Sequence, residues 1–138
     1  MSFEIRFPTR HTDSFAGTGF VHAGVLLSLT EMAYAAFEEH CGISKPESVY
    51  AVQRATEVTY QAPLRWQEGA VVAVATLSAS ERGFDQEFEI RSAADGRRIA
   101  RFVHHWVWFD TEAQRPVPLS DEHRRKLLEG GSQLNPPA

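Results

Sequence analysis

Several features that mark particular classes of protein are scarce in this sequence. Its 138 residues include a single cysteine, Cys41, which excludes an intrachain disulfide and is typical of a reducing compartment. Acidic residues outnumber basic ones by 18 to 14, and the net charge of −4 disfavours a nucleic-acid partner. No apolar run approaches the roughly 20 residues that span a bilayer, and the first residues lack an apolar signal segment. We therefore expect a cytoplasmic protein without membrane or nucleic-acid partners.

Motifs for metal binding and for serine or cysteine catalysis are also missing. The six histidines show no ligand spacing, and His104 and His105 are adjacent on a predicted strand, so their side chains point to opposite faces. There is no G-x-S-x-G nucleophile motif. Cys41 falls at the end of a predicted helix, where the helix dipole disfavours a thiolate, and we expect it to be inert. The sequence thus predicts no metal and no cofactor.

The sequence does contain the pattern of one α+β domain. With 43% hydrophobic residues, the chain can bury a substantial core. We place a single domain at residues 1–130 and a flexible tail at 131–138. One long helix is predicted from Ala23 to Cys41, ended by Gly42 in the left-handed conformation. A meander of strands around it indicates an antiparallel sheet with the helix on one face. The strand-like runs cover residues 3–9, 49–62, 70–80, 84–93 and 97–109.

Finer patterns predict how these elements connect. Asp95-Gly96 is a strong hairpin signal between the last two long strands, and Ser120 is placed to cap a short C-terminal helix. Period-two alternation predicts that one face of the first long strand carries Val52, Thr56, Val58 and Tyr60.

The most informative segment runs from Thr12 to Gly42. A glycine-containing loop precedes the predicted helix, whose first N–H groups have no partner within the helix and can donate to a ligand. The helix is apolar nearly all round, which predicts burial inside the fold. Burial of Glu31 without a basic neighbour on its own helix would make it a candidate general base. One stripe of the helix combines this acid with small residues: Gly24, Ser28, Glu31 and Ala35.

Further candidates lie near the start of the helix. Asp13 in the preceding loop is a second acid, and His22 directly precedes the helix. The backbone N–H groups of Ala23 and Gly24 are positioned to stabilise an oxyanion. Each side chain also has a purely structural interpretation. Asp13 closes a turn, His22 caps the helix, and Glu31 pairs with a neighbouring group.

The strands add two weaker signals. Arg54 and Arg82 are candidates for binding phosphate, although arginines on strands and hairpins are usually only solvated. The aromatic run from Trp106 to Phe109 fits sheet packing, a subunit interface or a pocket for an aromatic group. Apolar residues on both faces of this strand predict a homodimer or homotetramer.

The order of several motifs resembles that of hotdog-fold acyl-CoA thioesterases. The segment Gly19-Phe-Val-His22-Ala-Gly, with an acid nine places after the histidine at Glu31, resembles their loop and helix start. Later landmarks are similar to the 4-hydroxybenzoyl-CoA thioesterase branch, namely Ala62 to Trp66, the strand around Phe84, and Arg115 to Leu119. The resemblance implies a hotdog fold, in which an antiparallel sheet wraps around one long central helix. It also implies dimers with active sites at the interface.

The same resemblance assigns roles to individual residues. Glu31 matches the helix carboxylate of one branch, and Asp13 matches the loop aspartate that serves as nucleophile or base in the other. His22 matches the histidine before the helix, and Ala23, with Gly24 beside it, matches the backbone oxyanion donor.

Two departures from the family pattern leave the choice of acid open. A few extra residues separate Asp13 from the helix, and polar positions of the helix-carboxylate branch are replaced near Ala16 and at Ala35. An acyl-CoA substrate also makes Arg82 and Arg54 candidates for the phosphates of CoA.

The leading prediction is hydrolysis of an acyl-CoA, possibly an aromatic one, in which Asp13 or Glu31 attacks the thioester or activates water. A hotdog dehydratase or hydratase is the second possibility, but its acid lies closer to the glycine than Glu31 lies to Gly24. A non-catalytic acyl-binding hotdog protein is the third, and the presence of both acids counts against it.

Overall fold

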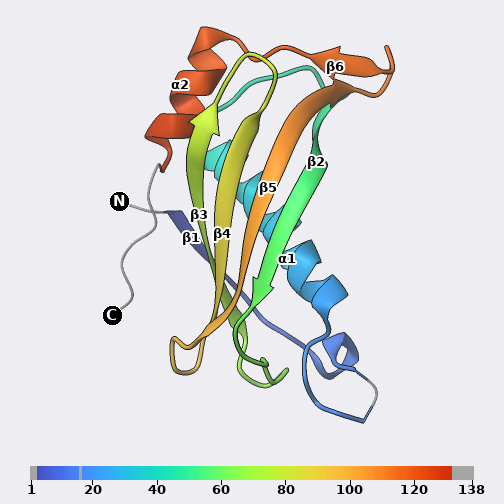
Figure 1. Ribbon diagram of the computed structural model, residues 1–138, viewed down its shortest axis with the longest axis vertical. Helices are drawn as coiled ribbons and strands as arrows, with labels where there is room; N and C mark the ends of the chain where they lie inside the picture. The colour runs from blue at the N-terminus through green and yellow to red at the C-terminus, as the bar shows by residue number, and fades with distance from the viewer. Residues whose placement is uncertain (1–2, 16, 132–138) are drawn as a thin grey trace.

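One sheet and two helices make up the computed structural model, which describes residues 3–15 and 17–131 (Figure 1). The predicted α+β architecture with an antiparallel sheet is confirmed. Apart from Gly131, the predicted tail lies outside the described residues, as does Ala16. In the part of the chain that the structure describes, neither helix has the length and apolar character needed to cross a membrane. The elements in chain order are β1 (Phe3–Phe7), the 3₁₀ turn η1 (His11–Asp13), α1 (Ala23–His40), β2 (Val49–Tyr60), β3 (Ala70–Ala79), β4 (Phe84–Ser92), β5 (Arg98–Asp110), β6 (Arg115–Val117) and α2 (Asp121–Glu129).

The sheet is antiparallel throughout, in the order β1-β3-β4-β5-β2, with β6 paired to the end of β5. The twelve-residue β2 is therefore an edge strand. The predicted turn between β4 and β5 is present, since Gly96 has a φ of 76° and donates to the Ser92 carbonyl over 2.9 Å. Ser92 in turn donates to the Arg97 carbonyl over 2.9 Å, so the loop spans residues 93–96 and is longer than a two-residue turn.

α1 lies against one face of the sheet, called the inner face below (Figure 1). Its buried side chains join those of the sheet in one hydrophobic core, which continues to Leu127 of α2. Ser120 caps α2 as predicted, because its Oγ accepts from the His123 N–H over 3.1 Å. The α1 side of this core consists of Leu26, Leu29, Thr30, Ala33, Tyr34 and Phe37.

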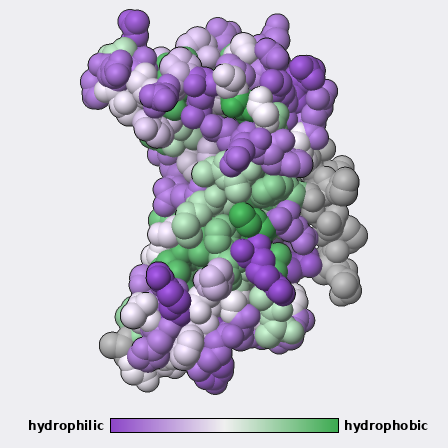
Figure 2. Space-filling view, turned by 180° about the vertical axis from the view of Figure 1, so that it is seen from behind, coloured by the Kyte–Doolittle hydropathy of each residue, from purple (hydrophilic) through white to green (hydrophobic). Residues whose placement is uncertain are grey.

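Only one side of α1 is covered, so the prediction of a helix enclosed within the fold is wrong for the single chain. The stripe of Gly24, Ser28, Glu31 and Ala35 is exposed, and Met32 beside it is 49% exposed. Figure 2 shows a band of hydrophobic surface on the side of the molecule where α1 lies. A helix that is apolar all round needs neighbours on every side. The described residues of this chain supply neighbours on only one side of α1.

The partly buried carboxylate of α1 is Glu38, with a side chain 16% exposed, whereas Glu31 is exposed. Tyr34 donates its hydroxyl to Glu38 Oε2 over 2.5 Å, and Lys45 Nζ lies 2.9 Å from Glu38 Oε1. Trp108 Nε1 on β5 donates to the Tyr34 hydroxyl over 3.4 Å. Burial, followed by the charge of Glu38, raises the pKa of Tyr34 well above its usual value. The phenol therefore stays protonated and holds the last turns of α1 against β5.

A β-bulge divides β2 into two halves. The cross-strand partners of β2 on β5 shift between Gln53 and Ala55, which leaves Arg54 as the extra residue. Gln53 therefore lies on the inner face opposite Trp106, while Val52 points to the outer face. The prediction that Val52 shares a face with Thr56, Val58 and Tyr60 is wrong for Val52, because the bulge inverts the alternation.

A row of polar side chains crosses the inner face beneath α1. His104 is fully buried, with Nε2 2.8 Å from Thr30 Oγ1 on α1 and Nδ1 2.9 Å from Thr56 Oγ1 on β2. Burial, and then the neighbouring His105, lower the pKa of His104 to about 4, so its ring is neutral near pH 7. His105 lies on the outer face, as the sequence predicts. The members of this row are Thr76, Gln86, His104 and Thr56.

Candidate functional site

The loop before α1 folds back and brings Asp13 to the start of the helix. Ser14 and Val21 form an antiparallel bridge, and the His22 N–H donates to the Asp13 carbonyl oxygen over 3.1 Å. Gly19, with a φ of 73°, adopts a conformation that favours glycine and permits the reversal. The extra residues between Asp13 and the helix are taken up in this turn, so they do not separate the two.

Two backbone N–H groups at the start of α1 are available to a ligand. His22 is the N-cap residue, and its carbonyl accepts from Val25 (3.0 Å) and Leu26 (3.3 Å). Within residues 3–15 and 17–131, no group accepts from the N–H of Ala23 or Gly24, and both residues are exposed. Their partial positive charge adds to that of the helix N-terminus, which favours an oxygen that gains negative charge.

The His22 ring lies beside these donors. His22 occupies the N-cap position, as the structural interpretation expects, but its side chain makes no capping hydrogen bond. Its ring packs edge-on against Phe15 with centroids 6.0 Å apart. A Cβ added at Gly24 would lie 3.2 Å from two atoms of the His22 ring. Because Gly24 has no side chain, the His22 ring has room to lie over the first turn.

The Asp13 carboxylate is partly engaged. Oδ2 accepts from the Arg10 N–H over 2.8 Å, which confirms the turn-closing role for one oxygen. Oδ1 lies 3.7 Å from the Arg10 guanidinium, which is itself 77% exposed. The Asp13 side chain is 15% exposed and so remains accessible. A contact of 3.7 Å to an exposed guanidinium contributes little stability, so it is easily exchanged for another partner of Oδ1.

Glu31 lies further along the helix than the N–H groups of Ala23 and Gly24. The helical rise puts its Cα about 12 Å along the axis from that of Ala23. Its exposure removes the premise that burial makes it a strong base. In a single chain, the structure therefore brings Asp13, His22, Ala23 and Gly24 together and places Glu31 apart from them.

An apolar pocket opens beside the first turn of α1. Its volume is about 390 Å³, within the size range of small-molecule sites. One wall comes from the loop after β2, which is fixed to the helix start because the Val21 N–H donates to the Leu64 carbonyl over 2.8 Å. The lining residues are Val21, Ala23, Leu26, Tyr60, Ala62, Pro63 and Leu64.

Sequence reasoning missed the roles of Tyr60 and Leu64 in this pocket. The segment from Ala62 to Trp66 stood out only as a family landmark. Its contact with the helix start depends on a backbone hydrogen bond between residues far apart in the chain, for which the side-chain pattern carries no signal.

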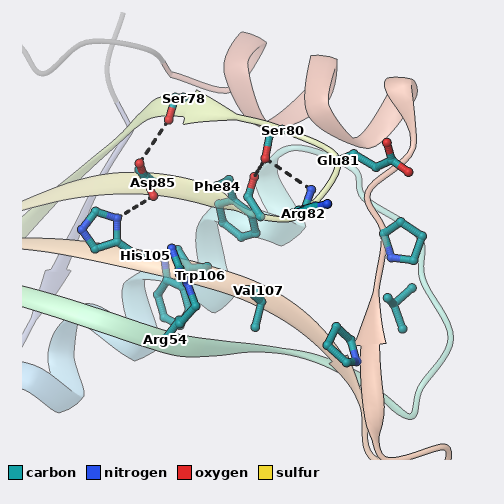
Figure 3. Close-up of a pocket in the computed structure, with 14 residues that line it drawn as sticks. Arg54, Ser78, Ser80, Glu81, Arg82, Phe84, Asp85, His105, Trp106 and Val107 are labelled. Carbon is teal, nitrogen blue, oxygen red and sulfur yellow. Dashed lines mark hydrogen bonds and ion pairs between the residues drawn. The ribbon is translucent and has the colours of Figure 1, made fainter.

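The two arginines selected from the sequence lie together, but on the outer face. Arg54 and Arg82 line one pocket of about 810 Å³ between the β3–β4 turn, β5 and β6 (Figure 3). Figure 1 shows this turn and β6 at the end of the sheet opposite to the start of α1. Neither arginine has a carboxylate partner among the described residues. Arg91, Arg97, Arg98 and Arg101, on β4, β5 and the hairpin between them, each have one, whereas Arg6 on β1 and Arg115 on β6 also have none within the described part of the chain.

Other reactive side chains do not form a site. Burial, and then the charge of Glu38, raise the pKa of the Cys41 thiol to about 11, which agrees with the predicted inert role. Among the described residues, no group of three or more histidine, cysteine, aspartate or glutamate side chains is arranged to hold a metal ion.

Comparison with known proteins connects this geometry to a family. The profile of the Thioesterase-like superfamily matches residues 12–127, which include both the start of α1 and most of the sheet. The chain belongs to this superfamily. Membership in the Thioesterase-like superfamily confirms the predicted class, a thioester hydrolase. No curated protein sequence matches the chain significantly.

Solved structures of thioesterases share the fold. A 1,4-dihydroxy-2-naphthoyl-CoA thioesterase from Synechocystis superposes with a TM-score of 0.77 at 18% identity, covering 92% of this chain and 96% of that one. A thioesterase from Thermus thermophilus, solved with coenzyme A and zinc, gives 0.76 at 22% identity over 92% of each chain. A predicted thioesterase from Bacillus stearothermophilus gives 0.82 at 19% identity over 96% and 98%. At these identities the similarity concerns the fold.

Proposed function

We propose that this member of the superfamily is an acyl-CoA thioesterase with a hotdog fold, in which the sheet wraps around α1 and the thioester binds at the start of that helix. The observation that carries the proposal is the position of the free Ala23 and Gly24 N–H groups next to an apolar pocket of about 390 Å³. A thioester has one polar carbonyl attached to an acyl group, which is apolar in most cases. The two features match these two parts.

The proposed reaction uses groups that lie together in one chain. The Ala23 N–H donates to the thioester carbonyl oxygen, while the Asp13 carboxylate removes a proton from water. The oxygen of that water bonds to the carbonyl carbon, the C–S bond breaks with its electron pair going to sulfur, and the sulfur takes the proton from Asp13, so that CoA leaves as the thiol and the Asp13 carboxylate is regenerated. One donor to an oxyanion contributes about 10²–10³ to the rate in known enzymes. The His22 ring, packed over the first turn, orients the thioester or the loop.

We favour Asp13 over Glu31 as the acid of this site because the Asp13 carbonyl is hydrogen-bonded to His22, directly before the donors. Glu31 is exposed on the open side of α1, where it is accessible to the active site of a second chain. Mixed oligomers of Asp13→Asn and Glu31→Gln chains separate the two arrangements. If Glu31 serves the partner's site, mixing two inactive variants restores part of the activity. If Asp13 acts without Glu31, the Glu31→Gln chain is active on its own.

The exposed edge of the sheet supports a homodimer or a dimer of dimers. β2 leaves one side of its backbone without a strand partner in the described chain. An exposed apolar edge strand pairs readily with another strand, and we propose that a second copy covers it. Wild-type protein should sediment as a dimer or larger species at micromolar concentration, and Val58→Lys should dissociate it. A wild-type monomer would contradict the proposal. The exposed apolar side chains of β2 are Tyr50, Val52, Val58 and Tyr60, between 38% and 58% exposed.

A hydrolysis screen with aromatic, short-chain and long-chain acyl-CoAs tests the function directly, with release of free thiol as the readout. We expect turnover of at least one class. Reversible water addition to an enoyl-CoA without thiol release would favour the dehydratase or hydratase alternative. Saturable binding of acyl-CoA without either reaction would favour a non-catalytic binding protein.

A further inference from the structure

The pocket on the outer face is formed where two strands depart from regular pairing. The bulge in β2 is at Arg54, and a second bulge in β3 occurs between Thr76 and Ser78. Both bulges lie next to one row of cross-strand neighbours on the outer face, Ser78, Asp85, His105 and Ala55. Bulges occur preferentially next to functional sites because they redirect side chains. Here the extra residue of β2 is an arginine that lines the pocket.

The β3–β4 turn brings the second arginine over the same pocket. Ser80 Oγ donates to the Gly83 carbonyl over 3.2 Å and accepts from the Arg82 N–H over 3.3 Å (Figure 3). The Ser80 N–H also donates to the Gly83 carbonyl, over 2.8 Å. A Cβ at Gly83 would overlap the Trp106 carbonyl oxygen, so only glycine lets the turn approach β5 this closely. Arg82 is therefore held at the rim of the pocket by a fixed turn.

Polar side chains in the lining are already hydrogen-bonded to one another. Asp85 Oδ1 lies 2.7 Å from His105 Nδ1, and Asp85 Oδ2 accepts from Ser78 Oγ over 3.3 Å (Figure 3). A carboxylate accepts only, so the proton of a neutral His105 is on Nδ1 and Nε2 remains for another partner. Asp85 is thus occupied by its neighbours. Glu81 is the other acid in the lining, and neither arginine forms an ion pair with it.

The opposite wall of the pocket is apolar. It consists of Val107 on β5 and the segment Pro116 to Pro118 at and after β6. A volume of about 810 Å³ fits a ligand of nucleotide size. The combination of two arginines without partners and an apolar wall suits a ligand that has both a phosphate and a flat apolar part.

We propose that this outer-face pocket is an anion site for a phosphate-bearing ligand, with Arg54 and Arg82 binding the phosphate and the wall from Pro116 to Pro118 contacting the rest. Guanidinium groups bind phosphate through paired, charge-assisted hydrogen bonds, which lysine and neutral side chains do not reproduce. The phosphate has two possible sources, the nucleotide end of CoA or a free phosphate compound. The site itself is independent of hydrolysis, whereas the CoA source depends on the function proposed above.

Calorimetric titration of the full chain tests the site without turnover. The probes are adenosine 3′,5′-bisphosphate, CoA, inorganic phosphate and, as the phosphate-free control, adenosine. We expect saturable binding of at least one phosphate probe. Arg54→Gln and Arg82→Gln should each weaken it about tenfold, since each removes a charge-assisted hydrogen bond at an exposed site. The double variant should abolish it. Adenosine should bind much more weakly than its bisphosphate.

Arg101→Gln is the matched control. It removes the same charge from the outer face of β5, but Arg101 is paired with Glu87 and does not line the pocket. The affinity of Arg101→Gln for the probes should equal that of the wild type. All variants should keep the wild-type thermal midpoint within a few degrees. No saturable binding of any phosphate probe would overturn the proposal. So would unchanged binding in the double variant, or an Arg101→Gln loss as large as that of the double variant.

The pattern across probes identifies the source. Equal arginine dependence for CoA and the bisphosphate assigns the site to the nucleotide end of CoA. Arginine-dependent binding of inorganic phosphate alone assigns it to a free phosphate compound. Thiol release measured separately keeps the two proposals distinguishable, because a protein that binds phosphate and hydrolyses no acyl-CoA would retain this site and lose only the proposed reaction.

Discussion

The two candidate binding regions lie at opposite ends of the sheet and are built from different groups. At the start of α1, the N–H groups of Ala23 and Gly24 have no partner among the described residues, Ala23 lines an apolar pocket, and the Asp13 backbone is hydrogen-bonded to His22. In the outer-face pocket, the side chains of Arg54 and Arg82 supply the charge. Backbone donors are fixed by the helix and cost no reorganisation as charge develops on a reacting oxygen. Arginine side chains carry a full positive charge, which suits a ligand whose negative charge is permanent. The first region is therefore suited to chemistry and the second to recognition.

The largest expected effect concerns the chemical region. Asp13→Asn keeps the shape and the hydrogen bond to Arg10 but removes the charge that accepts a proton from water. We expect kcat on a confirmed acyl-CoA substrate to fall about 10²-fold or more, as for loss of a general base, with little change in thermal stability. Glu31→Gln should act mainly on KM. If both variants keep nearly wild-type turnover, neither acid carries the reaction.

The next effect is the pH dependence of stability, for which His104 on the inner face and His105 on the outer face can be compared. An unfolded chain protonates histidine below about pH 6.5, whereas folded His104 accepts a proton only near pH 4. Between these values the unfolded state binds more protons, so stability present above about pH 6.5 is lost as the pH falls. The full shift corresponds to about 3 kcal/mol in the free energy of unfolding.

Urea titrations from pH 7 to pH 4 measure this loss. His104→Gln should flatten the dependence, although its stability at pH 7 falls because the contacts to Thr30 and Thr56 change. His105→Gln is the control on the same strand and should keep most of the slope. Equal slopes in wild type and His104→Gln would show that His104 does not cause the pH dependence.

A smaller effect concerns the apolar pocket beside α1. Tyr60→Ala enlarges it at the end of β2, so kcat/KM should shift by about tenfold toward bulkier acyl groups, the range expected when a hydrophobic pocket changes by a few carbon atoms. The measurement is the ratio of kcat/KM for a long-chain and a short-chain acyl-CoA. Tyr50→Ala, on the same edge strand but outside the pocket, should leave the ratio unchanged. A change of similar size in both variants would point to the oligomer interface.

The smallest expected effect is that of a chelator. The proposed reaction uses a carboxylate and backbone donors, so dialysis against a strong chelator should leave kcat unchanged. If the chelator instead lowers kcat strongly and added zinc restores it, the site at the start of α1 works by a different mechanism.

The fold follows from the sequence where the local pattern is regular. The apolar run from Ala23 and the glycine after Cys41 predict α1, the strand-like runs predict the central strands, and the structure reproduces them. Errors arise where the pattern depends on another part of the chain. The bulge at Arg54 inverts the alternation of β2, and the burial of a helix depends on what neighbours it has on each side.

The candidate site was predictable to a similar extent. The residues at the start of α1 were identified from the loop, the helix start and the resemblance, and the structure brings Asp13, His22, Ala23 and Gly24 together. The exposed position of Glu31 was not predictable, because the sequence of an apolar helix does not reveal which side of the helix faces solvent. The pairing of Arg54 with Arg82 in one pocket depends on strand register, which the alternation of single strands leaves undetermined.

The bulge in β2 has a consequence for insertions and deletions. Before it, the inner face carries Val49, Ala51 and Gln53, and after it Thr56, Val58 and Tyr60. Loss of a residue from the middle of a strand normally moves every following side chain to the wrong face. Deleting Arg54 would instead leave an unbroken alternation with all six residues still on the inner face. The present strand therefore differs from a regular one by a single extra residue, and that residue is an arginine that lines the outer pocket.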